Sequence, residues 1–383
     1  MTIQHTRIAI AGGGLAGLVA AWRLQQQGVR DVVLFEARAT LGGRILSVDA
    51  HGSSVDTALP ALDRFDLGPS WFWPTIQPQL DRLVTELGLE RFAQFEDGDL
   101  LVERAAGQPP QRMRGYVNDP PSMRLAGGTG ALVAALRARL DDAVVRTGST
   151  VRRLRCEVAH VDLTVDDSAG IATMWQAEQV LLALPPRLAA TRVQFDPPLP
   201  PELARRWQGT PTWMAPHAKY VAIYDTPFWR EQGLSGGARS GAGPMGEIHD
   251  ISMPGGHAAL FGFLGVPAQV RRQFSDEVLR MHCRAQLVRL FGERAGAPLG
   301  DALKDWANDP LNATDEDEDA AGHHATAPPS EADHGAWQGR LIGIGSEWSP
   351  QFPGYLAGAV DAAERGLRQI RVGNDRQRSE ADQ

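Results

Sequence analysis

The sequence predicts an α/β fold in which a Rossmann-like domain is combined with a second, α+β domain built from a mixed sheet and helices. The chain opens as strand, glycine-rich turn, helix and strand, and this order predicts a parallel sheet. Strand-like runs recur from Lys219 onward, which indicates another sheet. The length of 383 residues also favours two domains over one.

Apolar patterning places the elements of the first half. The runs RIAIA at 7–11 and VVLF at 32–35 are typical of short buried strands. Between them, helix-forming residues with apolar side chains at helical spacing predict a helix at 18–27, which Gly28 ends. The same patterns predict, further on, a helix at 131–140 and a buried strand at 180–184.

The second half reads as strands followed by helices. The patterns predict strands at 220–224, 246–251, 258–264 and 341–345, and helices at 268–291 and 354–370. Residues 315–334 are acidic, rich in proline and poor in apolar side chains, so we expect a mobile surface loop there. His323 and His324 in this loop lack the spacing of metal ligands, and no metal site is expected.

Both domains are expected to be discontinuous in sequence. The nucleotide-binding domain should comprise residues 1–75, 126–217 and 336–372, and the substrate domain residues 76–125 and 218–335. Residues 373–383 are polar and should form a tail. A ligand cavity is expected where the two domains meet, because such junctions are common places for binding sites.

Composition excludes several classes of function. The formal net charge is −8 and no basic stripe is present, so nucleic acid is not an expected partner. No run of about 18 apolar residues occurs, so no membrane anchor is expected. No secretion-type signal opens the chain, and the two cysteines, Cys156 and Cys283, make no disulfide framework. We therefore expect a reduced, cytoplasmic protein, while the sequence leaves the oligomeric state open.

The glycine-rich turn after the first strand predicts a dinucleotide site. Gly12, Gly14 and Gly17 follow the spacing G-x-G-x-x-G, which permits a tight turn, close approach to a pyrophosphate and close helix packing. Leu15 and Ala16 lie in this motif, where the N-terminal N–H groups of a helix can bind phosphates. Glu36 ends the second strand, where a carboxylate can bind both ribose hydroxyls. NAD and FAD both remain compatible with these residues.

Motifs along the rest of the chain narrow that choice. They are EARATLGGR at 36–44, DLGPSW at 66–71, GGTGAL at 127–132, LPP at 184–186, FDPPLP at 195–200, GSE at 345–347 and GYLAGA at 354–359. In this order, and over most of the chain, they resemble the flavoprotein amine oxidase superfamily, which includes monoamine oxidases, polyamine oxidases and L-amino-acid oxidases. The resemblance implies that the first domain binds FAD.

The resemblance also implies a role for each matched cofactor residue. Arg44 should lie near the pyrophosphate or the flavin, and Val151 should place its backbone against the adenine. Glu347 should lie near the ribityl-phosphate part, and Leu356 should begin a helix whose N–H groups stabilise negative charge at flavin N1–C2=O. The remaining cofactor-binding residues implied by the motifs are Ala37, Arg38, Gly42, Gly43, Gly68, Pro69, Ser70 and Gly345.

Lys219, Tyr355 and Trp71 are the candidate catalytic residues. Lys219 precedes a Pro-Phe-Trp segment at the spacing of the family, whose lysine holds a water against flavin N5, and a buried ammonium is costly without such a task. Tyr355 matches one wall of the family's aromatic cage, which orients an amine, and Trp71 matches an aromatic residue that lines the site. The second wall remains open between Trp306 and Trp348.

Departures from the family limit what can be transferred. Neither cysteine lies near the closing motif, so the FAD is expected to be non-covalent. Trp73 stands where many relatives have glycine, which favours a narrower cavity, Ala357 replaces a common acidic residue, and Pro69 replaces a glycine. Only about 50 residues precede Gly127 after the 66–74 segment, so the substrate domain is shorter than in full-length monoamine oxidases. The substrate itself is therefore not transferred.

The function expected from these residues is FAD-dependent oxidation of a C–N bond in an amine or amino acid. Hydride would pass to flavin N5, with O2 as the acceptor, so that a small amine-like molecule and O2 are the expected partners. Two alternatives remain open. One is an FAD-dependent desaturase or dehydrogenase that acts on a C–C or C–O bond, and the other is a flavoprotein that binds a partner without turnover.

Overall fold

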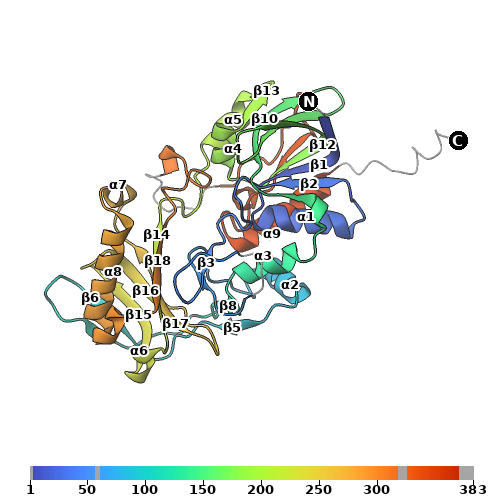
Figure 1. Ribbon diagram of the computed structural model, residues 1–383. Helices are drawn as coiled ribbons and strands as arrows, with labels where there is room; N and C mark the ends of the chain where they lie inside the picture. Colours follow the sequence, from blue (N-terminus) through green and yellow to red (C-terminus); the bar gives the residue numbers. More distant parts are fainter. Residues whose placement is uncertain (1–2, 57–60, 318–325, 371–383) are drawn as a thin grey trace.

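A computed structural model describes residues 3–56, 61–317 and 326–370 (Figure 1). Two large sheets lie in two lobes of the molecule, and helices flank both of them (Figure 1). Within these ranges, no helix combines the length and the apolar character that are needed to cross a bilayer. The expected tail at 373–383 and the His323-His324 pair lie outside the described residues.

The first sheet carries the N-terminal glycine turn. Its eight described strands are β1 (Ile3–Ala11), β2 (Val32–Phe35), β9 (Val145–Arg146), β10 (Thr150–Cys156), β11 (Val161–Asp166), β12 (Ala172–Leu182), β13 (Gln194–Asp196) and β19 (Leu341–Gly343). They run in the order β13-β10-β11-β12-β1-β2-β9, with β19 also paired to β12. β9, β2, β1, β12 and β19 pair in parallel, so their carboxyl ends meet at one edge of the sheet.

Helices cover both faces of this sheet. One face packs against α1 (Leu15–Gln26), α2 (Pro78–Glu86), α3 (Gly130–Arg137) and α9 (Leu356–Gln369), and the other against α4 (Pro186–Arg192) and α5 (Pro201–Gln208). Ile8 and Ile10 of β1 point to the first face and Ala9 and Ala11 to the second, as the alternation of a strand requires. Burial on both sides explains why these strands read as continuous apolar runs.

The second sheet is mixed, as the sequence predicted. Its strands, in spatial order, are β18 (Gly300–Asp305), β14 (Ala218–Tyr224), β17 (Ala258–Leu264), β16 (Met245–Asp250), β15 (Leu234–Ser240), β6 (Asp99–Glu103) and β7 (Gln111–Met113). β15 and β6 pair in parallel, and the other neighbours are antiparallel. Together with the Rossmann-like first sheet, this confirms the predicted fold class.

Shorter elements complete the described chain. Helix α8 (Asp276–Phe291) covers one face of the second sheet, as Figure 1 shows. The remaining elements are the short helices α6 (Phe228–Glu231) and α7 (Ala268–Arg271), the two-residue to three-residue strands β3 (Ser47–Val48), β4 (Phe65–Asp66), β5 (Arg91–Ala93) and β8 (Met123–Leu125), and the 3-10 turns η1 (Asp142–Val144), η2 (Glu293–Gly296), η3 (Asp315–Asp317) and η4 (Ser346–Trp348).

The single helix expected at 268–291 is two helices in the structure. α7 ends at Arg271, and α8 begins at Asp276. Between them Ser275 takes an extended conformation, and its hydroxyl oxygen accepts a hydrogen bond from the N–H of Val278. A serine in this position caps a new helix, because it satisfies an N–H group that would otherwise have no partner.

The expectation of a mobile surface loop at 315–334 is wrong for parts of that segment. The carboxylate of Asp317 is fully buried at 0% exposure. The carbonyl of Pro329 accepts hydrogen bonds from the indoles of Trp207, at 2.8 Å, and Trp348, at 3.2 Å. The acidic composition of the segment does not predict these contacts, because each depends on a partner far away in the sequence.

The strands of each sheet come from separate stretches of the chain. The first sheet draws its strands from residues 3–35, 145–196 and 341–343, and the second from 99–113 and 218–305. The exact domain boundaries stay a prediction. What matters for the site is that the carboxyl edge of the first sheet and strand β14 of the second contribute to one cavity.

Candidate active site

Most of the candidate residues predicted from the sequence line one cavity of about 600 Å³. The nineteen that line it are Gly12, Gly14, Leu15, Ala16, Glu36, Ala37, Arg38, Gly42, Gly43, Arg44, Gly68, Pro69, Ser70, Trp71, Val151, Lys219, Gly345, Tyr355 and Leu356. The remaining two, Gly17 and Glu347, are not part of the lining. Gly17 packs on the glycine turn, and Glu347 pairs with a lining arginine.

Glycines at the end of β1 bring helix α1 close to the sheet. Gly12 has a φ of +113°, which other residues rarely adopt, and a Cβ atom on Gly17 would lie 2.0 Å from the carbonyl oxygen of Gly12. At Gly14, by contrast, a Cβ would meet no protein atom closer than 3.8 Å. The space beside Gly14 opens on the cavity at the N-terminus of α1, where a pyrophosphate fits.

Glu36 lies at the carboxyl end of β2 and is held by two backbone groups. Its Oε2 accepts from the N–H of Gly13 at 2.7 Å, and its Oε1 accepts from the N–H of Arg38 at 2.8 Å. Burial raises the pKa of this carboxyl, although the two N–H groups and the charge of Arg38 oppose the rise. Val151 of β10 lines the same end, so this part of the cavity suits a ribose and an adenine.

The arrangement fits an extended dinucleotide such as FAD. The cavity is lined by Glu36 and Val151, by Gly14, and by Lys219 and Tyr355. Leu356 also lines it and begins α9, with Tyr355 as the N-cap residue. The N-terminus of a second helix is thus available there for the negative charge of a flavin ring.

Arg44 and Glu347 form a bidentate ion pair beside the cavity. Two nitrogens of Arg44 reach the two carboxylate oxygens of Glu347 at 2.5 and 3.0 Å, and one also donates to the hydroxyl of Ser346 at 2.9 Å. Burial acts to raise the pKa of Glu347, but the charge and hydrogen bonds of Arg44 outweigh it and hold the pKa below its ordinary value. Glu347 therefore stays ionised and fixes the guanidinium of Arg44 at the cavity wall.

Lys219 is fully enclosed, and its amine is held on several sides. It donates to Ser70 Oγ at 2.7 Å and to the carbonyl of Gly68 at 3.1 Å. It also lies 3.9 Å from the ring centre of Phe261. Burial lowers the pKa of Lys219 to about 7, while the carboxylate of Asp66 opposes this shift. A lysine with such a pKa has both protonation states accessible near neutral pH.

The rings of Tyr355 and Trp213 both line the cavity and lie near each other. Their planes are tilted by 35°, and their centroids are 5.9 Å apart. Gly354 permits this approach: its φ is +83°, and a Cβ there would lie 2.2 Å from Cβ of Trp213. Burial raises the pKa of Tyr355, which keeps the phenol neutral. The pair Trp213–Tyr355 thus resembles two facing aromatic walls.

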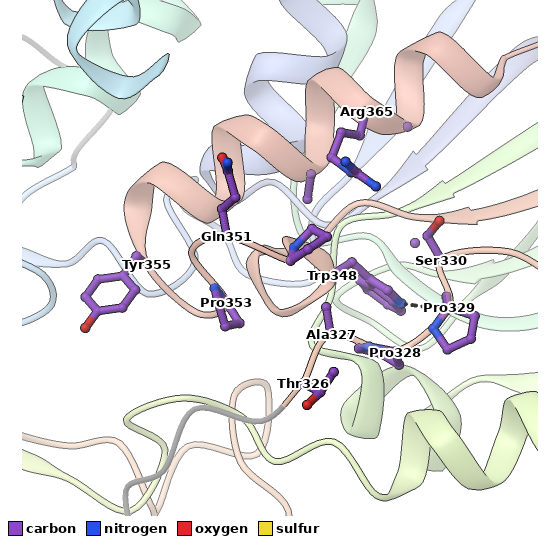
Figure 2. Close-up of a pocket in the computed structure, with 14 residues that line it drawn as sticks. Thr326, Ala327, Pro328, Pro329, Ser330, Trp348, Gln351, Pro353, Tyr355 and Arg365 are labelled. Atoms are coloured by element: carbon purple, nitrogen blue, oxygen red, sulfur yellow. Dashed lines mark hydrogen bonds between the residues drawn. The ribbon is translucent and has the colours of Figure 1, made fainter. Parts of the chain in front are cut away.

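The two tryptophans proposed for the second wall lie in different places, and the choice of that wall stays a prediction. Trp348 is buried against Trp207, with centroids 5.2 Å apart, and it lines a second cavity behind α9. Figure 2 shows its indole directed at Pro329, while the ring of Tyr355 points away from it. Trp306 does line the main cavity, but its indole N–H is used by the carbonyl of Leu67 at 3.0 Å.

Two further tryptophans, Trp71 and Trp73, contribute to the site. Trp71 donates its indole N–H to Gln94 at 2.8 Å and packs edge-on against His249. Trp73 donates to the hydroxyl of Ser122 at 3.0 Å. Both line the cavity, and the narrower cavity expected at Trp73 stays a prediction. Their polar atoms are satisfied away from the cavity, which leaves aromatic surface facing it.

Sequence reasoning missed the segment that precedes β14. Trp213, Met214 and His217 all line the cavity. His217 lies two positions before Lys219, so strand alternation could have placed both on one face. Burial and the charge of Arg271 lower the pKa of His217, while a carbonyl of Met214 opposes the shift, and the imidazole is neutral at pH 7.

Comparisons with known proteins agree with this geometry. Residues 98–370 match the family described as flavin containing amine oxidoreductase, and residues 10–87 match an NAD(P)-binding Rossmann-like domain. A Mycobacterium tuberculosis protein that carries the name flavin-containing monoamine oxidase AofH is 32% identical, over 95% of this chain and 96% of that relative. Amine oxidase [flavin-containing] B of Sus scrofa is 26% identical over 68% of this chain and 49% of its own length.

Solved structures with the same fold include two enzymes named for their amines. Putrescine oxidase bound to putrescine has a TM-score of 0.74 at 19% identity, covering 96% of this chain and 99% of that one. Cyclohexylamine oxidase from Brevibacterium oxydans has a TM-score of 0.75 at 19% identity, covering 95% and 98%. The chain belongs to the family of flavin-containing amine oxidoreductases, and it is an FAD-dependent oxidoreductase of the amine oxidase type.

Proposed function

We propose that this enzyme oxidises a monoamine whose body is uncharged and apolar, with O2 as the acceptor of the electrons. The observation that carries the proposal is the aromatic pair Trp213–Tyr355, which lines the same cavity as the buried amine of Lys219. FAD bound in this cavity would supply the chemistry, by accepting a hydride from the carbon next to the amine nitrogen. The protein side chains bind and orient the amine.

The lining of the cavity is rich in aromatic side chains. It includes Trp71, Trp73, Trp213, Phe263, Trp306 and Tyr355. Such surfaces bind an apolar ring or chain by burying it, at about 25 cal/mol for each Å² removed from water. Two facing rings also restrict the rotation of a bound amine, and correct orientation contributes strongly to the rate.

The described lining of the cavity carries few negative charges. Among the described residues that line the cavity, Glu36 is the one carboxylate, and it lies at the ribose end. Arg38 pairs with Asp309 at 2.9 Å, Arg44 pairs with Glu347, and Arg152 pairs with Asp166 at 3.2 Å, while Arg192 and Lys219 also line the cavity. A second ammonium, as in a diamine, would therefore enter a lining in which cations outnumber carboxylates, which is costly.

Lys219 has a role that differs from that of the aromatic walls. Its amine is fixed by Ser70 and Gly68 at the edge of the cavity, and its hydrogen bonds within the described part of the chain go to a hydroxyl and a carbonyl oxygen. A positive charge held there favours negative charge that develops on a neighbouring group, such as dioxygen as it accepts electrons. The proposal assigns to Lys219 the reaction with O2 rather than the binding of the amine.

The relatives support an amine but do not decide its class. The Mycobacterium tuberculosis relative is named for monoamines, while an L-amino acid dehydrogenase of Synechocystis is 25% identical over 66% of this chain. The neighbours in fold are named for a diamine and for a cyclic monoamine. The choice of an apolar monoamine rests on the lining of this cavity. A cytoplasmic location, expected from the sequence, remains part of the proposal.

The test is anaerobic bleaching of the FAD absorbance. The purified enzyme is mixed with benzylamine, cyclohexylamine, putrescine and a set of L-amino acids, and then air is admitted. We expect the first two amines to bleach the absorbance, with return of colour in air, and we expect putrescine and amino acids to act far more weakly. Stronger bleaching by putrescine or an amino acid would contradict the substrate class. No bleaching by any amine would redirect the search to C–C and C–O bonds.

A further inference from the structure

Trp213 is held through its backbone as well as through its ring. The N–H of Trp213 donates to Oε1 of Glu347 at 3.3 Å. The preceding N–H, that of Thr212, donates to Oδ1 of Asp317 at 2.8 Å. The following residue, Met214, has a φ of 61°, a left-handed conformation that is costly for a residue with a side chain. Two carboxylates from separate segments thus fix the backbone just before a strained residue.

Asp317 does not line the cavity, yet it is enclosed by polar partners. Its Oδ1 also accepts from Nη1 of Arg187 at 2.7 Å, and its Oδ2 accepts from the N–H and hydroxyl of Thr314, both at 2.9 Å. Arg187 is 8% exposed and donates its Nε to the carbonyl of Gln208 at 2.7 Å. The carboxylate is therefore fixed in one position between α4 and the segment that precedes Trp213.

Stability alone gives no reason for such a pair. Removing two charges from water costs several kcal/mol for each ion, and well-packed apolar residues often serve equally well in the same place. Unlike an apolar side chain, a fixed carboxylate accepts a hydrogen bond from the N–H of Thr212 in a defined direction. Its effect is to fix the backbone next to Trp213.

We propose that Asp317 is a positioning residue, which holds Trp213 in place opposite Tyr355 through the N–H of Thr212 and is itself held by Arg187. The inference rests on the proposed function, because that function gives Trp213 the task of orienting the amine. It adds a residue outside the cavity, from an acidic stretch, to the determinants of the reaction.

Two double variants, both without charge at the two positions, test the inference. Arg187→Met/Asp317→Ala removes the acceptor of the Thr212 N–H, while Arg187→Gln/Asp317→Asn keeps a carbonyl oxygen there. Neither leaves an unpaired buried charge, so both are expected to fold. Arg289→Gln/Glu103→Gln is the matched control, because Glu103 is also a buried carboxylate paired with an arginine, in the second sheet.

The first readout is hydrogen exchange of the peptide that contains residues 208–217, which needs no substrate. In Arg187→Met/Asp317→Ala we expect this exchange to quicken about tenfold, because local opening becomes easier, and we expect the amide-keeping variant to restore most of the protection. The control should leave the peptide unchanged. Unchanged exchange in Arg187→Met/Asp317→Ala would overturn the inference, whatever amines the enzyme oxidises.

The second readout is the rate constant of anaerobic bleaching by the best amine. Arg187→Met/Asp317→Ala should lower it on the order of tenfold to a hundredfold, since small errors of orientation are costly. If Asp317 acts through Trp213, the same change made in Trp213→Ala should cause little further loss. Losses that multiply would overturn the inference. A wild-type enzyme that no amine bleaches would sink the proposed function alone, and the exchange result would still decide whether Asp317 holds the segment.

Discussion

Lys219 and Ser70 are joined by a hydrogen bond of 2.7 Å between the lysine amine and the serine hydroxyl oxygen. Ser70 follows β4 in the N-terminal part of the chain, and Lys219 lies on β14 of the second sheet. The bond therefore ties the two halves of the cavity together. It also leaves the amine fixed at the cavity edge, with the ring of Phe261 on another side.

Replacement of Lys219 by methionine should separate the two halves of the reaction. We expect Lys219→Met to be bleached by amines at a rate within about threefold of the wild type, because the aromatic walls are intact. Its return to the coloured form in air should slow about a hundredfold, because a preorganised charge is lost. Stopped-flow absorbance measures both. Arg294→Met, which removes an exposed cation outside the lining, is the control. An unchanged reaction with O2 in Lys219→Met would refute the role.

The pKa of Lys219 also predicts how stability depends on pH. In the folded protein the amine loses its proton near pH 7, whereas the ordinary pKa is 10.5. Between these values the unfolded chain binds more protons, so this residue's contribution to the free energy of unfolding rises with pH, by at most about 1.4 kcal/mol per pH unit. The free energy of unfolding of the wild type, measured relative to that of Lys219→Met, should therefore increase from pH 7 to 9.5. A constant difference in urea unfolding would contradict the lowered pKa.

The part of the site that was predictable from sequence is local or follows a motif. The glycine turn was predictable because the spacing of Gly12, Gly14 and Gly17 has a steric cause. The position of Glu36 at the ribose was predictable from the length of one βαβ unit. Lys219 and Tyr355 came from the resemblance to the family. Both line the cavity, and their catalytic roles stay predictions, while the match to the family confirms FAD as the cofactor.

The part that was not predictable depends on contacts between distant segments. Trp213 lies in a stretch of turn residues without periodic pattern, and it faces Tyr355 because Gly354 lets the two backbones approach. Asp317 resembles one more charge in an acidic run, although two of its partners, Arg187 and Thr212, lie more than a hundred positions away in the sequence. Local patterns carry no information on such pairs.

Two glycines of the turn should respond differently to alanine. Gly17→Ala places a methyl group against the carbonyl oxygen of Gly12, so it should destabilise the protein by about 1–3 kcal/mol and weaken FAD binding as a consequence. Gly14→Ala meets no protein atom within 3.8 Å, so the apoprotein should unfold within about 0.5 kcal/mol of the wild type.

For Gly14→Ala the loss should appear in FAD affinity instead, because the methyl group occupies space beside the N-terminus of α1. Urea unfolding of the apoproteins and titration with FAD distinguish the two effects. Equal losses of stability in both variants would show that the turn, rather than the cofactor, requires glycine at both positions.

Glu347 should be essential for the shape of the cavity wall even though it does not line it. Glu347→Gln leaves Arg44 without its ionic partner and weakens the contact to the N–H of Trp213. Because Arg44 is partly exposed, we expect a loss of about 1–3 kcal/mol in the free energy of unfolding at pH 7, smaller than for a fully buried pair. Glu202→Gln is the control, since its pair with Arg205 is exposed and should contribute little.

The pH dependence of this loss has a definite sign. The folded pKa of Glu347 lies below its ordinary value of 4.5, so the stabilisation is present in full above pH 4.5 and is lost as the pH falls through the folded pKa. The gap between wild type and Glu347→Gln should therefore narrow at acid pH. Denaturant unfolding of both proteins at pH 7 and at successively lower pH measures it. A gap that widens below pH 4.5 would mean that burial, and not Arg44, sets the protonation of this carboxyl.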